Sequence, residues 1–391
     1  MPGERRPKSL VLLESEGAPR RGDAARPALV HVLGTRSDAV TLAPVIAALD
    51  RSATFDQHIL QTGQDTGTAM VDDVLADLGV PAPDRSLGLG PGSRCAQTAS
   101  ALAAAGELLA ESRPAAVVVT GAADSVLGCG LAAAKLDVPV ARVEAGLREY
   151  DWSVPEEVNR VLLDTLADSL FASSAQAAEN LSREGIGAGR VHLVGSTAVD
   201  SIRRVERRAR ERAVWRRYGI DRGGYVLATL NRPANLDDDE RLARIVEALA
   251  GLARRVQVIL PLRSRTRRRL EPMGDAYRLQ AAGVRCGPPL SYLDFVSLQA
   301  GAGAIVTDSG IVQEESTALG VNCFTLGSTT ERTVTVTHGT NSLLGDDPRD
   351  IAEIRLGAAA PAPFAIPLWD GGAGERIAAA LVANYALVRS S

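Results

Sequence analysis

The chain has 391 residues, 46% of them hydrophobic, and its 43 basic and 47 acidic side chains give a formal net charge of −4. This length predicts two domains, and the charge balance excludes the strongly basic surface of a nucleic-acid-binding protein. Lys8 and Lys135 are the only lysines, and there are only four histidines. A Schiff-base lysine and a histidine-rich metal site are therefore not expected.

The cysteines and the hydropathy pattern predict a cytoplasmic protein. Cys95, Cys129, Cys286 and Cys323 lack CxxC spacing, so we expect small buried residues rather than disulfides or metal ligands. No apolar run approaches the roughly 18 residues of a membrane span, and the apolar block at residues 10–13 is too short for a signal-peptide core. We expect no membrane partner and a disordered N-terminal extension at residues 1–26.

From residue 28 onward, short β-branched runs alternate with longer segments rich in alanine and leucine. This alternation predicts βαβ units with parallel strands covered by helices. An N-terminal domain is expected at residues 27–200, with strands at 29–33, 58–61, 116–120, 138–143, 169–172 and 191–194. A C-terminal domain is expected at 201–368, with strands at 225–230, 256–260, 284–286, 304–307 and 322–326. The predicted fold class is α/β, with two doubly wound domains.

Three segments fall outside this alternation. The join at residues 201–219 is rich in arginine at helical spacing, which predicts a charged helix that is a solvated face or a linker. Residues 358–368 carry prolines that exclude a long helix. Residues 369–391 are predicted to form a C-terminal helix that crosses back to the N-terminal domain.

The turn after the predicted strand at 304–307 is the clearest candidate for a binding site, because ligands of open α/β sheets bind at the carboxyl ends of strands. Ser309 and Gly310 precede a helix, so their N–H groups and the helix dipole suit a phosphate. Glu315, about one turn further along, is placed to accept hydrogen bonds from ribose hydroxyls. The alternative is that Asp308 and Ser309 only cap the helix.

Two more turns carry charged side chains. Arg36 follows a Gly-Thr turn after the first strand, where it either faces an anion across a domain cleft or lies on the surface as a cap residue. Glu144 ends a strand and Glu156 begins the next helix, so these carboxylates are candidates for an acid and a base. The alternative pairs Glu144 with an arginine and gives Glu156 only its favourable place at a helix N-terminus.

A series of collinear segments runs from about Leu29 to His338: GTRSDAVTLAP, QTGQ, VEAGLR, PEEVNR, NRPANLDD, TDSG with QEE, and TTER. Together they resemble the non-hydrolysing UDP-N-acetylglucosamine 2-epimerase family. The resemblance implies the GT-B fold, in which two Rossmann-like domains hold a nucleotide-sugar between them, usually in a homodimer. It implies a UDP-sugar as the small-molecule partner, no redox cofactor and no obligatory metal.

The resemblance also implies roles for individual residues. Ser309, Gly310 and Glu315 match positions that hold the diphosphate and ribose, and Phe295 matches an aromatic residue near uracil. Arg36 and Arg332 match arginines that face the diphosphate and sugar. Glu144 and Glu156 match the glutamates of the chemistry, which removes UDP and the C2 proton to form a glycal and then adds UDP back with inverted C2. The matching motifs add four expected substrate-binding residues, namely Arg148, Arg160, Asn231 and Arg232.

The chain departs from the family pattern at several positions. Ala122 stands where the family has a catalytic aspartate, and Asp124 is the expected substitute. Asn231 and Ala234 replace a histidine and a glutamate. The other replaced positions are Thr41, Asp65, Arg142, Arg263 and Ile311. Because losing one general acid or base costs roughly 10²–10⁴-fold in rate, these changes bear on activity rather than on fold.

Three functions follow from this sequence. The first is a divergent 2-epimerase that acts on a UDP-N-acetylhexosamine through elimination and re-addition of UDP. The second is a glycosyltransferase or nucleotide-sugar hydrolase in which Glu144 or Glu156 activates an acceptor hydroxyl or water. The third is a catalytically inactive nucleotide-sugar-binding homologue.

Overall fold

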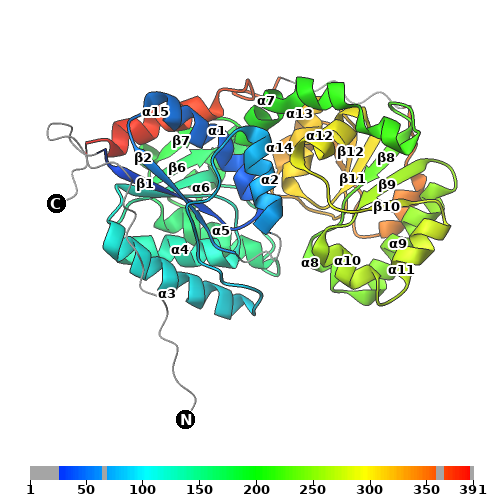
Figure 1. Cartoon of the computed structure of the whole chain (residues 1–391), viewed down its shortest axis with the longest axis horizontal. Coiled ribbons are helices and arrows are strands. Elements are labelled where there is room, and N and C mark those ends of the chain that lie inside the picture. Colours follow the sequence, from blue (N-terminus) through cyan, green and yellow to red (C-terminus); the bar gives the residue numbers. More distant parts are fainter. Residues whose placement is uncertain (1–25, 64–67, 358–364, 388–391) are drawn as a thin grey trace, which may run out of the picture.

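The computed structural model describes residues 26–63, 68–357 and 365–387. Outside these ranges lie the expected N-terminal extension up to residue 25, Asp65, most of the proline-interrupted segment and the end of the expected terminal helix. The described residues form two parallel sheets with helices packed against their faces (Figure 1).

The N-terminal sheet has seven strands in the order β3-β2-β1-β4-β5-β6-β7. They are β1 (Ala28–Leu33), β2 (Asp56–Gln61), β3 (Arg85–Ser86), β4 (Ala116–Val119), β5 (Val140–Ala145), β6 (Ser169–Ala172) and β7 (Val191–Leu193). The helices between them are α1 (Arg36–Ser52), α2 (Thr68–Leu78), α3 (Arg94–Ser112), α4 (Asp124–Lys135), α5 (Pro155–Leu166) and α6 (Ala175–Arg183).

The C-terminal sheet has six strands in the order β10-β9-β8-β11-β12-β13. They are β8 (Tyr225–Ala228), β9 (Gln257–Pro261), β10 (Arg285–Gly287), β11 (Ala304–Thr307), β12 (Cys323–Thr325) and β13 (Asn341–Leu343). Its helices are α8 (Pro233–Leu236), α9 (Asp239–Ala253), α10 (Ser264–Leu270), α11 (Asp275–Ala281), α12 (Tyr292–Gly301), α13 (Gly310–Leu319) and α14 (Thr333–Thr337).

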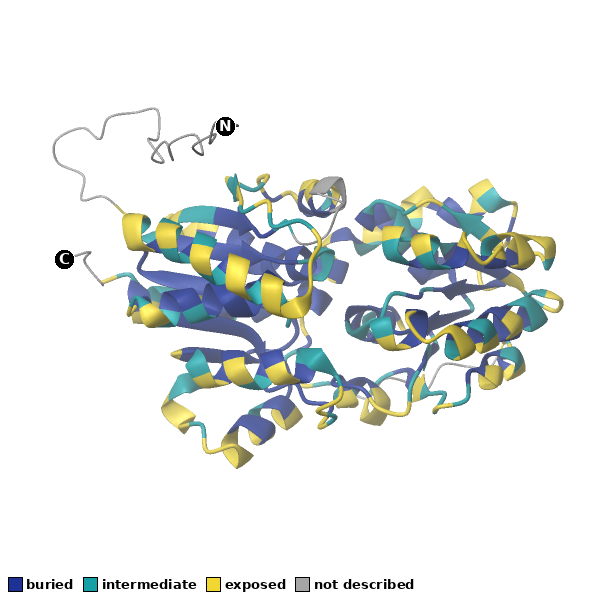
Figure 2. Cartoon of the chain, turned by 90° about the horizontal axis from the view of Figure 1, so that it is seen from below, coloured by how far each residue is buried: buried dark blue, intermediate teal, exposed yellow. Residues whose placement is uncertain are grey.

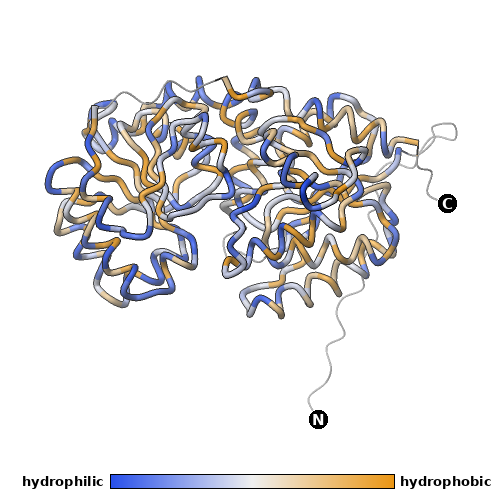
Figure 3. The backbone as a smooth tube through the Cα atoms, turned by 180° about the vertical axis from the view of Figure 1, so that it is seen from behind, coloured by the Kyte–Doolittle hydropathy of each residue, from blue (hydrophilic) through white to orange (hydrophobic). Residues whose placement is uncertain are grey.

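The predicted α/β class with two doubly wound sheets is confirmed, and the arrangement is that of the GT-B fold. Figure 2 shows buried strands between helices whose outer faces are exposed, and Figure 3 shows hydrophobic residues concentrated along the strands. In both sheets the carboxyl ends of the first strands, β1 and β8, lie beside those of β4 and β11, where the strand order reverses. Ligand sites of such sheets form at this point.

One helix links the two sheets, and the last helix of the described residues packs against the N-terminal domain. α7 (Thr197–Arg212) occupies the arginine-rich join and buries Ile202, Val205 and Ala209, so it is more than a solvated linker. It packs against α1 on one side and against α12 and α13 on the other. α15 (Ala373–Tyr385) lies beside α1, and its Tyr385 hydroxyl is 2.7 Å from Ser169 Oγ (Figure 1).

The segment that leads into α7 and the segment that leads into α15 are in contact. Gly195, in the segment before α7, has φ +88°, and a Cβ at this position would overlap the carbonyl oxygen of Leu368. Glycine adopts this conformation without strain, and its lack of a Cβ leaves room for the backbone at Leu368. The backbone before α15 therefore packs directly against the backbone before α7.

The structure bears on three further features: membrane-spanning helices, metal-ligand clusters and the cysteines. In the described part, no helix is both long enough and apolar enough to cross a membrane, and no three metal-ligating side chains form a cluster. All four cysteines are free, and Cys129 and Cys323 are buried. The expectation of burial is wrong for Cys95, which is exposed in the first turn of α3.

Candidate functional site

A cleft lies between the carboxyl ends of the two sheets. Its larger part is a cavity of about 790 Å³ lined by residues of both domains. A smaller pocket of about 70 Å³ adjoins it on the side of the C-terminal domain. Four residues line both parts, which makes them one continuous cleft: Ser37, Asn231, Ser309 and Ile311.

The smaller pocket brings together Arg36 and Phe295, two residues that the resemblance assigns to ligand binding. The Arg36 guanidinium lies 6.0 Å from the centre of the Phe295 ring, within range of a cation–π interaction. Burial, together with nearby Arg263, lowers the pKa of Arg36 to about 10. Among the described residues Arg36 Nη2 has no hydrogen-bond partner although it is buried. This cation is therefore available to an acceptor that enters the pocket.

Glu315 lies at the base of the same pocket, on α13. Its carboxylate accepts hydrogen bonds from the Tyr292 hydroxyl at 2.9 Å and from Gln299 Nε2 at 2.7 Å. Burial raises the pKa of Glu315 to about 7, even though both bonds oppose this shift. The result is a fixed carboxyl group facing a pocket that also has an aromatic wall.

The N-terminus of α13 opens into the cleft. Ser309 is its N-cap residue, but no side chain in the described part of the chain makes a capping hydrogen bond there. Asp308 is turned away, because its carboxylate accepts the backbone N–H groups of Asn231 and Arg232 at 2.9–3.0 Å. The simple capping role left open by the sequence is therefore wrong, and the helix N-terminus can receive an anion.

Gly310 allows the close packing at this point. A Cβ on Gly310 would overlap the Glu331 carboxylate and lie 3.1 Å from Arg332 Nε. Arg332 Nε is buried, and within the described residues it has no hydrogen-bond partner. A donor on Arg332 thus lies beside the first turn of α13, where the helix dipole also favours a negative charge.

Arg332 and Arg232, which line the larger cavity, form ion pairs within the C-terminal domain and with the N-terminal domain. Arg332 Nη1 donates to Glu144 Oε1 in the N-terminal domain and to Glu314 Oε1, each at 2.8 Å. Arg232 pairs with Glu149 and Glu331 at 2.6 Å. The alternative given by the sequence, in which Glu144 pairs with an arginine, is thus correct for its contact with Arg332. Glu144 nevertheless lines the cavity and has φ +61°, a strained conformation that is concentrated at functional sites.

Asp124 and Glu156 also line the larger cavity. Asn159 of α5 donates from Nδ2 to Asp124 Oδ1 and to the Ala122 carbonyl oxygen, both at 2.9 Å. This fork fixes Asp124 two residues from Ala122, the position at which the resemblance implies an aspartate. Glu156 is half-buried in the first turn of the same helix as Asn159. The three carboxylates proposed from the sequence therefore face one cavity.

The remaining predicted residues separate into two groups. Arg160, Arg232 and Gly310 line the larger cavity, and Asn231 lines both parts of the cleft. Arg148 does not line the cleft. Its guanidinium pairs with Asp164 at 2.7 Å and with Glu184 at 2.6 Å, beside a separate surface hollow.

Sequence reasoning missed two buried charged residues that line the cavity. Asp38 accepts the N–H groups of Gly34 and Thr35 at 2.9 and 2.8 Å, and burial raises its pKa to about 7. Arg142, noted only as a departure, is completely buried and pairs with Asp164 at 3.3 Å. A charged residue in the middle of an apolar strand run was the signal that could have revealed Arg142.

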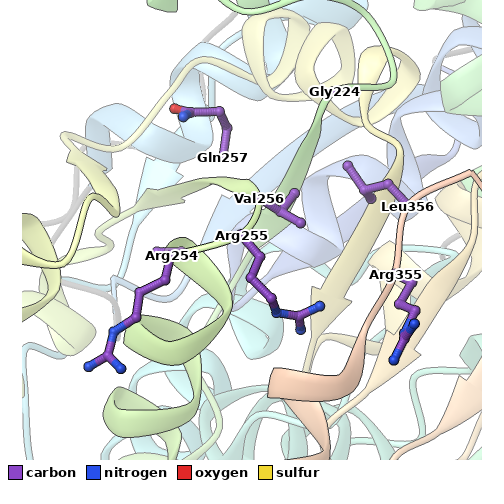
Figure 4. Close-up of a pocket in the computed structure, with 8 residues that line it drawn as sticks. Gly224, Arg254, Arg255, Val256, Gln257, Arg355 and Leu356 are labelled. Carbon is purple, nitrogen blue, oxygen red and sulfur yellow. The ribbon is translucent and has the colours of Figure 1, made fainter.

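A second hollow lies at the opposite end of the C-terminal sheet. Gly224 before β8 and Gln257 at the start of β9 line it, together with Arg254, Arg255 and Arg355. Figure 4 shows the Arg254 guanidinium lying well apart from those of the other two arginines. The hollow is at the amino ends of the strands, where sheets of this type do not build their active sites.

Comparisons with known proteins agree with this cleft. A family model described as UDP-N-acetylglucosamine 2-epimerase matches residues 47–382. The UDP-N-acetylglucosamine 2-epimerase of Methanocaldococcus jannaschii is 37% identical, over 88% of this chain and 96% of the relative. The UDP-2,3-diacetamido-2,3-dideoxy-D-glucuronate 2-epimerase of Pseudomonas aeruginosa is 35% identical, over 81% of this chain and 88% of the relative.

Solved structures extend the match to the whole fold. The M. jannaschii UDP-GlcNAc 2-epimerase in complex with UDP-GlcNAc and UDP has a TM-score of 0.85 at 36% identity, covering 91% of this chain and 99% of that one. The Neisseria meningitidis UDP-GlcNAc 2-epimerase bound to UDP-GlcNAc has a TM-score of 0.79 at 27% identity, covering 91% and 100%. The chain described here therefore belongs to the UDP-N-acetylglucosamine 2-epimerase family.

Proposed function

We propose that the protein is a UDP-sugar 2-epimerase that acts on a UDP-N-acetylhexosamine. The observation that carries this proposal is the uncapped N-terminus of α13 beside Arg332 Nε, at the junction of a small aromatic pocket and a larger polar cavity. This Nε is 3.7 Å from Glu331 Oε1 and has no hydrogen-bond partner among the described residues. This arrangement suits a molecule with an aromatic base, a diphosphate and a sugar. Related proteins named as UDP-sugar 2-epimerases support the same choice.

In this proposal the nucleoside occupies the smaller pocket. Phe295 packs against uracil, and Glu315 accepts hydrogen bonds from ribose. The diphosphate lies at Ser309 and Gly310, where the α13 N–H groups, Arg332 and Arg36 neutralise its charge. These cations also stabilise UDP as it leaves, which is what the elimination requires.

The sugar then lies in the larger cavity, among Glu144, Glu156 and Asp124. One carboxylate takes the proton from C2 while the bond between C1 and the UDP oxygen breaks, which gives a glycal and UDP. The reverse step delivers a proton to the opposite face of C2 as UDP attacks C1 again. Glu144 and Glu156 are proposed as the base and the acid, and Asp124 as the substitute for the aspartate replaced by Ala122.

Incubation of the purified protein with UDP-N-acetylglucosamine in heavy water tests the proposal. We expect deuterium at C2 and a second UDP-hexosamine, detected by NMR and mass spectrometry. UDP release that depends on an acceptor or on water, with no deuterium at C2, would instead identify a transferase or hydrolase. Tight binding of UDP-N-acetylglucosamine with neither outcome would identify an inactive binding homologue.

We also propose that the protein works as a homodimer through an apolar patch around α5. This patch consists of Tyr150, Trp152, Val158 and Leu162, all of which are exposed in the single chain. Trp152 is 65% exposed and Leu162 45% exposed. Because large apolar side chains left exposed on one short segment of a chain mark protein interfaces, a second copy of the chain is the proposed partner of this segment.

A further inference from the structure

Glu149 of the N-terminal domain and Glu331 of the C-terminal domain meet beside the larger cavity, which Glu331 lines. Arg232 bridges them, because its Nη1 donates to Glu149 Oε1 and its Nη2 donates to Glu331 Oε2, each at 2.6 Å. The side chains of Glu149 and Glu331 are 1% and 8% exposed, so both carboxyls are largely shielded from water. This carboxyl pair therefore ties one domain to the other at the cleft.

The two carboxyls of the pair are also bonded to one another. A hydrogen bond joins the Glu149 and Glu331 side chains directly, and since an ionised carboxylate can only accept, one of the two groups must carry a proton. Burial and the charge of Glu331 raise the pKa of Glu149 to about 7. Burial would also raise the pKa of Glu331, but three nearby arginines hold it well below its ordinary value, namely Arg232, Arg160 and Arg332. The proton is therefore held by Glu149 and donated to Glu331.

The other charged groups around the pair have closer partners elsewhere. Glu157 of α5 accepts from Arg160 Nε at 2.8 Å and from the Glu149 N–H at 3.2 Å, whereas Arg160 Nη2 is 3.5 Å from Glu149 Oε2. Arg332 Nη1 is bonded to two other carboxylates, and its Nε is 3.7 Å from Glu331 Oε1. One guanidinium group thus makes short bonds to both carboxyls, and the shared proton balances the second negative charge.

Glu331 also faces the place proposed for the diphosphate. A Cβ on Gly310 would lie 2.1 Å from Glu331 Oε1, so this carboxyl is directly beside the first turn of α13. A diphosphate at this turn brings negative charge close to Glu331 and favours the protonated form of the pair. By linkage, the protonated pair then favours the bound ligand to the same extent.

We propose that the proton shared by Glu149 and Glu331 holds the two domains together, and that a nucleotide-sugar binds preferentially to the form of the protein that keeps this proton. The inference rests on the proposed function for the position of the diphosphate, and it adds regulation of the site by pH. Loss of the proton leaves two ionised carboxylates in contact beside an anionic ligand. The affinity for the ligand should therefore fall as the pH rises through about 7.

Isothermal calorimetry with UDP-N-acetylglucosamine on the full chain tests this coupling, because the diphosphate of this ligand does not itself titrate near neutral pH. We expect the dissociation constant to rise roughly 3- to 10-fold between about pH 6.5 and about pH 8.5. Titrations near pH 7.5 in two buffers of different ionisation enthalpy should show uptake of a fraction of a proton on binding. An affinity that does not change with pH would overturn the proposal.

Glu149→Gln imitates the protonated side chain, because its amide N–H can donate to Glu331 while its oxygen accepts from Arg232. At about pH 8.5 this variant should bind the ligand as tightly as the unmodified protein does at about pH 6.5. Asp38 and Glu315 also titrate near neutral pH, but they are present in both proteins, so the difference between the proteins isolates the carboxyl pair. Full pH dependence in Glu149→Gln, or weaker binding at every pH, would contradict the assignment.

A control and a second readout complete the test. Glu179→Gln, an exposed change on α6, should keep the full pH dependence of the unmodified protein. Proton-linked binding that Glu149→Gln removes, without deuterium at C2, would support the shared proton and remove the epimerase proposal. Deuterium at C2 together with the same pH dependence of binding in Glu149→Gln and the unmodified protein would do the reverse.

Discussion

Arg332 Nη1 of the C-terminal domain donates a hydrogen bond to Glu144 Oε1 of the N-terminal domain at 2.8 Å. The Nε of the same guanidinium lies beside Gly310, where the diphosphate is proposed to bind. One rigid group therefore touches both the proposed base and the proposed leaving group. Any shift of Arg332 toward the diphosphate lengthens its hydrogen bond to Glu144.

Replacing Glu144 by Gln keeps the shape of the side chain but removes its charge. We expect deuterium incorporation at C2 to fall by roughly 10²–10⁴-fold, as for loss of a general base. The affinity for UDP should change little, since Glu144 lies on the sugar side. Glu179→Gln, an exposed change on α6, is the matched control. An unchanged exchange rate in Glu144→Gln would show that this residue is not the base.

Asp124→Asn tests whether Asp124 replaces the missing aspartate. The bond from Asn159 to Oδ1 can persist in this variant, so the fold should be preserved while the ionisable group is lost. We predict a decrease in kcat of roughly 10²-fold or more, with little change in KM. A kcat within twofold of the unmodified protein would assign Asp124 to structure alone.

Phe295→Ala tests the base-binding wall of the smaller pocket. Loss of the ring removes stacking on uracil and the contact with Arg36, so the dissociation constant of UDP should rise by roughly 5- to 100-fold. Tyr277→Ala, in the same domain and 76% exposed, should leave it unchanged. Isothermal calorimetry with UDP measures both. Equal affinities for UDP in the two variants would place uracil elsewhere.

The raised pKa of Glu315 predicts a dependence of stability on pH. Burial raises this pKa from 4.5 to about 7, so between these values the folded chain keeps a proton that the unfolded chain has lost. The free energy of unfolding therefore falls as the pH rises through this window, by about 3 kcal/mol for this group. Glu315→Gln cannot ionise and should lack this contribution.

Urea unfolding of both proteins at pH 5 and pH 8 measures the effect. We expect Glu315→Gln to be less stable than the unmodified protein at pH 5, with the difference shrinking or reversing at pH 8. Glu179→Gln again serves as the control, because its side chain is exposed. A stability difference that is the same at both pH values would show that Glu315 is ionised throughout.

The proposed dimer can be separated with two polar substitutions. Trp152→Ser with Leu162→Ser removes two exposed apolar side chains of the α5 patch, and light scattering should then report a monomer in place of a dimer. Met273→Ser, an exposed apolar residue of the C-terminal domain, is the control and should leave the dimer intact. A dimer that survives the double substitution would place the interface on another surface.

The sequence predicted best the features that depend on short-range chemistry. β6 and β11 begin and end at the residues that the sequence predicts, 169–172 and 304–307, since strands buried on both faces are largely apolar. β3 has only two residues and carries no such run, so it was missed. Ser309 and Gly310 were found because a strand, a turn and a helix follow one another without interruption.

The directions of individual side chains could not be predicted from the sequence. Arg148 is four residues from Glu144, yet the backbone turns at Gly146, with φ +81°, and sends Arg148 into a different hollow. The hydrogen-bond partners of Asp308 are 73–77 residues away in the sequence. The sequence therefore could not predict that the Asp308 side chain points away from α13 and toward these partners. Both outcomes depend on tertiary contacts rather than on local pattern.

The uncapped start of α13 has a consequence for the stability of the folded protein. The Asp308 carboxylate is bonded to the neighbouring loop and does not cap α13. The N–H groups in the first turn of α13 are therefore left for a bound ligand. A nucleotide at about 100 times its Kd adds about 2.7 kcal/mol to the free energy of unfolding. If the nucleotide binds as proposed, it also stabilises the fold, and the lifetime of the protein in a cell should follow the supply of its substrate.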